Sequence, residues 1–192
     1  HLRFRRQRQM CIRDRKKEVF ANASGWVREA GSALSGNDNT SADPEILVAI
    51  GELSTSIGAA DITEVEMITT TADKSDGFTI SVRVRYNEAV DVVTTGGTPT
   101  LAVTNSNAGT GSGRGPHSLS YASGTGTNEL VFSLAIAAAN AATNADDVLS
   151  VAAQSIALNS GTIKDAAGTA SNASLVISSD AVTDAGTVTV TA

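Results

Sequence analysis

Three stretches of the chain alternate between apolar and polar residues, a pattern typical of β-strands with one buried face. The clearest is FTISVRVRY at 78–86, and similar alternation occurs in LVFSLAI at 130–136 and in TVTVTA at 187–192. We therefore expect three strands that point their apolar side chains at a core, with Arg83 and Arg85 on the wet face of the first. The inward side chains of that first strand are expected to be Phe78, Ile80, Val82, Val84 and Tyr86.

Residues that permit chain reversal separate these stretches. Glycine tolerates the positive φ angles of tight turns, and Asn and Asp tolerate them better than most other residues. Short strands between such turns predict an all-β protein, with an antiparallel β-sandwich over residues 59–192. An alanine-rich stretch at 135–149 is compatible with either a short helical turn or an irregular crossover. The turn signals are Asp76-Gly77, Gly96-Gly97, Gly124-Thr125-Gly126, Asn159-Ser160-Gly161 and Gly168.

Residues 16–58 precede the predicted sandwich. The segment 31–45 is polar and rich in turn-forming residues, and ILVAIGEL at 46–53 predicts a strand. We expect a small N-terminal β-extension or hairpin with a flexible tip. Trp26, the only tryptophan, is expected to pack between this extension and the main domain, in preference to stacking on a sugar.

The first 15 residues do not fit the rest of the chain. RRQRQMCIRDR at 5–15 contains five arginines and the only cysteine. The codons CGT CGG CAG CGT CAG ATG TGT ATA AGA GAC AGR encode this string, and they are similar to a transposase adapter used in short-read sequencing. We interpret residues 1–15 as an adapter-derived artefact, expect them to be disordered, and exclude them from inference about fold and function.

Without this segment the protein is strongly acidic. The first 17 residues hold eight of the 14 Lys and Arg residues and one of the 20 Asp and Glu residues, so six basic and 19 acidic side chains remain, a net charge of −13. Phosphate binding needs clustered positive charge, and the remaining basic residues are scattered, so we expect no nucleic-acid partner. With the cysteine excluded, disulfide frameworks and thiolate metal sites are excluded too. Apolar runs are far shorter than the ~20 residues of a membrane-spanning helix, so we expect no membrane insertion.

Four stretches follow one another along the chain: YNEAV at 86–90, GTPTL at 97–101, YASGTGTNELVF at 121–132 and LNSGTIKDAAG at 158–168. Through these stretches, residues 61–178 resemble the bacterial Ig-like repeat domain of large surface proteins and adhesins. The resemblance implies an Ig-like antiparallel β-sandwich in which the motifs have structural roles. The loop at 105–117 is longer than the family's turn, and the N-terminal extension lies outside the family pattern. A single module with such an extension is also similar to the Ig-like domains that decorate tailed-phage virions.

Three acidic residues are candidate metal ligands. Asp165 in KDAAG fits a turn in which its carboxylate accepts hydrogen bonds from backbone amides. The resemblance implies calcium as the alternative, because adjoining Ig-like repeats of this kind share carboxylate-bound ions at their junctions. Asp146 and Asp147 form the second candidate site, for which a solvated loop is the simpler interpretation. Apart from calcium, no cofactor is expected.

Residues suited to catalysis are scarce. Besides His1, the only histidine is His117, so a Ser-His-Asp triad would depend on it alone, and no G-x-S-x-G motif occurs. We therefore expect no enzymatic activity. The glycine-rich loop at 109–115 lacks the Lys-Ser or Lys-Thr of a phosphate-binding loop. If the protein binds a ligand, Arg114 and His117 at this loop are the candidates, with His117 expected to be exposed.

These observations predict a non-enzymatic structural or adhesive display module on a phage virion. The alternative is an Ig-like domain of a secreted bacterial adhesin, stabilised by calcium, and a carbohydrate-binding domain ranks third because aromatic residues are few. Either of the first two places the protein on a virion or at the cell surface. Expected partners are other virion or cell-surface proteins and surface glycans. The strand at 187–192 is a candidate edge for pairing with a second copy in a homo-oligomer.

Overall fold

The computed structural model describes residues 18–22, 25–32, 38–49, 59–107, 115–141, 143–166 and 171–192. Within these ranges every regular element is a β-strand, which confirms the predicted all-β class. None of the described residues belongs to a helix long and apolar enough to cross a membrane. The adapter-like residues 1–15 lie outside the described ranges. The alanine-rich stretch at 135–149 contains turns and loop between two strands, with Ala142 not described, and so forms the irregular crossover.

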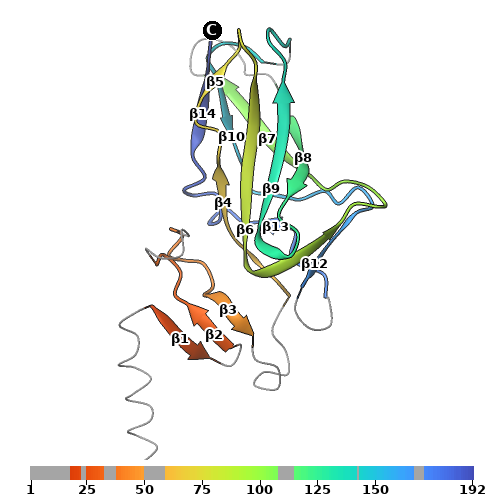
Figure 1. Ribbon diagram of the computed structural model, residues 1–192. Coiled ribbons are helices and arrows are strands. Elements are labelled where there is room, and N and C mark those ends of the chain that lie inside the picture. Colours follow the sequence, from red (N-terminus) through yellow and green to blue (C-terminus); the bar gives the residue numbers. More distant parts are fainter. Residues whose placement is uncertain are drawn as a thin grey trace, which may run out of the picture.

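The small N-terminal β-extension is a three-stranded antiparallel sheet in the order β1-β2-β3. In Figure 1 it lies below the main body of the molecule, in red and orange. A bulge between Trp26 and Val27 shifts the register between β2 and β3. The strands are β1 (Val19–Asn22), β2 (Gly25–Arg28) and β3 (Glu45–Ala49).

The main body is a nine-stranded sheet that curls around a single core. One half has the order β4-β6-β9-β8 and the other the order β7-β10-β14-β5, and the pair β7-β8 joins the two halves. All of these pairs are antiparallel except β14 with β5. The ninth strand, β12 (Thr162–Asp165), pairs with the end of β6. The other eight are β4 (Ile62–Met67), β5 (Ala72–Asp73), β6 (Phe78–Val93), β7 (Thr100–Asn107), β8 (His117–Ser123), β9 (Thr127–Ile136), β10 (Asp147–Ser150) and β14 (Thr187–Thr191).

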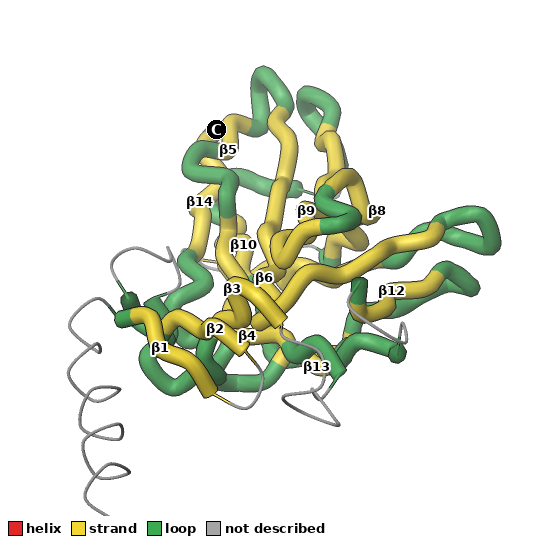
Figure 2. The backbone as a smooth tube through the Cα atoms, turned by 60° about the horizontal axis from the view of Figure 1, so that its bottom comes forward, coloured by secondary structure: helices red, strands yellow, loops and turns green. Residues whose placement is uncertain are grey.

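The end of the long strand β6 leaves the main body. Here β12 (Thr162–Asp165) replaces β4 as its neighbour, pairing with residues 90–93. Figure 2 shows β6 and β12 extending together away from the other strands, with loops at their outer end. A two-stranded ribbon of β11 (Gln154–Ser155) and β13 (Val176–Ile177) completes the segment between β10 and β14.

The alternating pattern places the core as predicted. Ile80, Val82, Val84 and Tyr86 of β6 are buried, and Phe78 is packed against the core at its edge. Val188 and Val190 are buried on β14 in the same way. These side chains belong to one core cluster, so the alternation of apolar residues determines which face of each strand is covered. The same cluster contains Leu101 and Val103 of β7, Leu149 of β10 and Ile163 of β12.

Two expectations about individual residues are wrong. Trp26 does not pack between the extension and the main domain, because its side chain is 47% exposed and its neighbour Val27 is the buried residue of β2. Arg85 does not face water, because only 8% of its side chain is exposed. The C-terminal strand β14 lies inside the sheet between β10 and β5, although β5 pairs only with Val190 and Thr191.

Candidate functional site

His117 is buried, contrary to expectation. It begins β8, where the alternation that buries Leu119 also turns His117 inward, and it is 5% exposed. Its Nε2 atom lies 3.2 Å from Nδ2 of Asn105 and 3.5 Å from Oγ1 of Thr143, which is fully buried. Burial lowers the pKa of His117, and the negative charge of Asp147 acts in the opposite direction. His117 is therefore a neutral member of an interior network at neutral pH.

Asp147 belongs to the same interior network. Its carboxylate accepts hydrogen bonds from the Asn144 amide at 2.8 Å, from Asn105 Nδ2 at 3.3 Å and from Asn107 Nδ2 at 3.5 Å. It is fully buried rather than solvated, and it holds the turn that precedes β10. Because Asn105 contacts both Asp147 and His117, two residues that the sequence suggested for different sites lie in one cluster.

The other loop candidates are placed differently. Asp146 is exposed, has a φ of 67° and donates its amide to the carbonyl of Val190 at 2.9 Å. Arg114 lies outside the described residues. Calcium at Asp146 and Asp147 and ligand binding at Arg114 and His117 stay predictions.

Asp165 lies beside an acidic residue that the sequence analysis did not select. It ends β12, is 5% exposed, and donates its backbone amide to the carbonyl of Ser171 at 2.9 Å. Near it on β6 is Glu88, which is 4% exposed and whose two carboxylate oxygens have no hydrogen-bond partner in the part of the chain that the structure describes. Burial, reinforced by the negative charges of Asp165 and Asp61, raises the pKa of Glu88 to about 7.

A signal for Glu88 was present in the sequence. Continuing the alternation of β6 from Tyr86 to Val90 places Glu88 on the buried face, where a carboxylate is unexpected. Gly168, the other turn residue expected with Asp165, lies outside the described residues. Over the described part of the chain, no set of three or more Asp, Glu, His or Cys side chains has the arrangement of a metal site.

A ladder of charged side chains covers the outer face of β4, β6 and β9. Arg85 contacts Glu64 at 3.4 Å and Glu129 at 2.6 Å, and Arg83 pairs with Glu66 and Glu129. The pair Arg85 and Glu64 is buried because the N-terminal segment lies over it: the amide of Asp38 donates to Glu64, and Asn128 of β9 donates to Glu45. Burial raises the pKa of Glu64 to about 7, and Arg85 opposes this.

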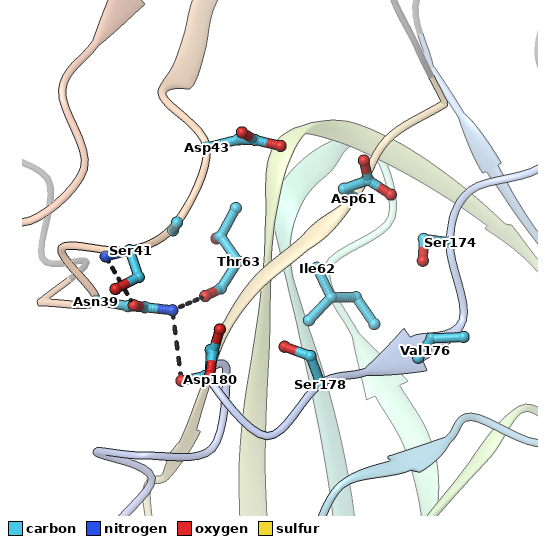
Figure 3. Close-up of a pocket in the computed structure, with 11 residues that line it drawn as sticks. Asn39, Ser41, Asp43, Asp61, Ile62, Thr63, Ser174, Val176, Ser178 and Asp180 are labelled. Atoms are coloured by element: carbon cyan, nitrogen blue, oxygen red, sulfur yellow. Dashed lines mark hydrogen bonds between the residues drawn. The ribbon is translucent and has the colours of Figure 1, made fainter.

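A cleft of about 330 Å³ lies where the N-terminal segment meets the main body. Figure 3 shows Asp43 on the N-terminal side and Asp61 and Asp180 on the other. Asn39 closes the contact by donating to the carbonyl of Thr63 at 2.7 Å and to that of Asp180 at 3.5 Å. The lining contains hydroxyl groups and small apolar side chains, but no Lys, Arg, His or aromatic residue. This chemistry disfavours anionic ligands and provides no stacking platform for a sugar ring.

No family model matches the chain, and neither a curated protein nor a solved structure matches it significantly.

Proposed function

We propose that residues 59–192 form an Ig-like β-sandwich that acts as a non-enzymatic structural or adhesive display module on a phage virion. The observation that carries this proposal is the contact among the four stretches that resemble the Ig-like repeat family. In the structure these stretches lie side by side and form hydrogen bonds with one another. Segments that define a family by sequence are expected to interact when they specify its fold.

Four hydrogen bonds link the four stretches to one another in a ring. The amide of Tyr121 donates to the carbonyl of Pro99, linking YASGTGTNELVF to GTPTL, and the amide of Gly126 donates to Val90, linking it to YNEAV. Asn159 Nδ2 donates to the carbonyl of Thr98 at 3.0 Å, linking LNSGTIKDAAG to GTPTL. The amide of Ala166 donates to Ala89 at 3.0 Å, linking KDAAG to YNEAV. Each stretch therefore holds two of the others in place.

The strand order supports the same proposal. An Ig constant-type sandwich has strands A, B, E and D in one sheet and C, F and G in the other. Labelled in chain order, β4-β6-β9-β8 corresponds to A-B-E-D and β7-β10-β14 corresponds to C-F-G, with β5 as an added edge strand. The segment carrying β11, β12 and β13 is then an insertion between F and G.

The placement of polar groups favours display over catalysis. His117 is enclosed in an interior network with Asp147 and Asn105, so it has no access to a soluble substrate. Among the described residues that line the cleft beside Asp61, there is no His or Lys to act as the base for a serine hydroxyl. The exposed loops at the outer end of β6 and β12 are the surfaces available to partners (Figure 2). Many weak contacts by copies on one particle would give avidity.

The proposed alternative is an Ig-like domain of a secreted bacterial adhesin, with the same fold in a different setting. Sequencing the genes on either side of this reading frame distinguishes the virion module from the adhesin domain. Neighbouring genes for capsid, portal or tail proteins are expected. Further Ig-like repeats or a secretion signal in the same reading frame would overturn the virion assignment in favour of the adhesin.

A further inference from the structure

Glu88 occupies a gap between two strands that use the same edge of β6. β4 pairs with residues 82–86 of β6, and β12 pairs with residues 90–93. Residues 87–89 lie between these pairings, where the register against β9 is also irregular. The side chain of Glu88 therefore enters the interior at the point where one neighbouring strand begins and the other ends.

The segments that carry Asp61 and Asp165 flank this gap. Asn87 and Asp61 are tied by two hydrogen bonds, from the Asn87 amide to the Asp61 carbonyl at 3.0 Å and from the Asp61 amide to Asn87 Oδ1 at 2.8 Å. On the other side, the amide of Ala166 donates to the carbonyl of Ala89 at 3.0 Å. The residues before and after Glu88 are thus fixed to the segments that carry Asp61 and Asp165.

Among the described residues, no group compensates the charge of Glu88. Both of its carboxylate oxygens are buried without a hydrogen-bond partner, and the charged groups that act on it are the acids Asp165 and Asp61. A buried carboxylate without a partner is unfavourable, because the ion loses its hydration and gains no compensating contact. Its environment fits a positive ion rather than an anion or a neutral ligand, because each nearby charge is negative.

We propose that Glu88 and Asp165 bind a divalent cation of the calcium type in this gap, with Asp61 adding negative charge at its exposed side. Calcium takes six to eight oxygen ligands, including carboxylates, backbone carbonyls and water, in flexible geometry. The described residues contain no set of three acidic ligands arranged for a metal ion, so a bound calcium would have to take its remaining ligands from backbone carbonyls and water. The site joins the start of β4 to the end of β12, so the ion stabilises the junction of the main body with the β6 and β12 extension. This inference does not depend on whether the module belongs to a virion or a cell.

The test is calorimetric titration of CaCl₂ into the EDTA-treated and dialysed full chain, paired with thermal unfolding in EDTA and in millimolar calcium. The wild type is expected to bind calcium and to melt several degrees higher with it, because a ligand that binds only the native state stabilises that state. Glu88→Gln keeps the shape and removes the charge, and it is expected to weaken binding by at least about tenfold. Asp165→Asn serves as the second variant, and Asp43→Asn, an exposed acid of the cleft, is the matched control.

Three results would overturn the proposal. The first is a wild type that neither releases nor absorbs heat with calcium and does not change its melting temperature. The second is calcium binding that survives in both Glu88→Gln and Asp165→Asn, which would place the ion elsewhere. The third is loss of folding of Glu88→Gln in EDTA, since this would mean that the Glu88 carboxylate already has a protein partner.

Discussion

Gly97 lies so close to Asn159 that a Cβ atom on Gly97 would overlap the carbonyl oxygen of Asn159. The side chain of Asn159 reaches back over the same turn and donates to the Thr98 carbonyl and to Thr100 Oγ1, each at 3.0 Å. Thr100 and Ala157 also exchange both backbone hydrogen bonds, at 2.8 and 3.0 Å. The loop before β7 and the loop before β12 therefore form one unit at the outer end of the molecule.

We expect Gly97→Ala to destabilise the protein by at least about 1–3 kcal/mol, because overpacking against a fixed backbone must displace one of the two loops. Chemical denaturation with the denaturation midpoint as readout measures this change. Thr98→Ala, an exposed position in the same turn, is the control and is expected to alter stability by less than about 0.5 kcal/mol. Equal effects of the two substitutions would contradict the contact.

Arg85 and Arg83 provide a matched pair on one strand, with 8% and 31% of their side chains exposed. Arg85→Met leaves Glu64 buried without its cation and is expected to cost about 3–5 kcal/mol. Arg83→Met removes a partly solvated pair and is expected to cost less than about 1 kcal/mol. Urea denaturation of both variants at neutral pH measures the difference. If both variants lost the same stability, the N-terminal segment would not cover Arg85 in solution.

The buried histidine predicts a specific pH dependence. The folded-state pKa of His117 is lowered from 6.5, chiefly by burial, so the unfolded chain takes up the proton first as the pH falls. The contribution of His117 to stability is therefore present above about pH 6.5 and decreases below it. We expect His117→Gln to lose less stability than the wild type between pH 7 and pH 5. The comparison at pH 8, where the imidazole is neutral in both states, separates this effect from lost packing, and identical pH profiles would exclude it.

Trp26 reports on the N-terminal extension, since the chain has no other tryptophan. Its exposure predicts a native emission that acrylamide quenches readily and that changes little on unfolding. Trp26→Ala is expected to leave the melting of the main body unchanged, because Trp26 is not part of its core. A blue-shifted and protected emission would instead mean that Trp26 packs between the extension and the main body.

The exposed indole of Trp26 also allows a test of the third candidate function, carbohydrate binding. Trp26 lies opposite Val48 on the small sheet, and Val48 is exposed as well. One aromatic ring with an aliphatic neighbour is a minimal platform for sugar stacking, so we expect any signal on a glycan array to be the same for the wild type and Trp26→Ala. Binding that disappears in Trp26→Ala would support a carbohydrate-binding function against the display module.

The strands and their inward faces could be predicted because the alternation of apolar and polar residues within a strand is a local pattern of consecutive residues. Val82, Phe132 and Val190 are buried for that reason. The same alternation would also have turned His117 inward, but its polarity and the neighbouring glycine-rich loop suggested exposure instead. Glu88 continues the alternation of β6 onto the buried face and was not selected. For a polar residue in such a strand, its position in the alternation predicts burial better than its polarity does.

The burial of Arg85 could not be predicted in this way. It depends on a segment more than 35 residues away in sequence, whose Asp38 amide reaches Glu64 and whose Glu45 accepts from Asn128. The cleft beside Asp61 has the same origin, because it is formed by two parts of the chain that have no common sequence pattern. Contacts between distant segments left no local signal.

The central claim is that this chain is an Ig-like display module of a virion, and one measurement tests it most directly. Purified virus particles and the cell-envelope fraction of the source sample would be digested, and peptides from residues 59–192 would be quantified by mass spectrometry. The account predicts enrichment in the particle fraction together with capsid peptides, at a stoichiometry of many copies per particle. Enrichment in the cell-envelope fraction, with no peptides in the particles, would contradict it.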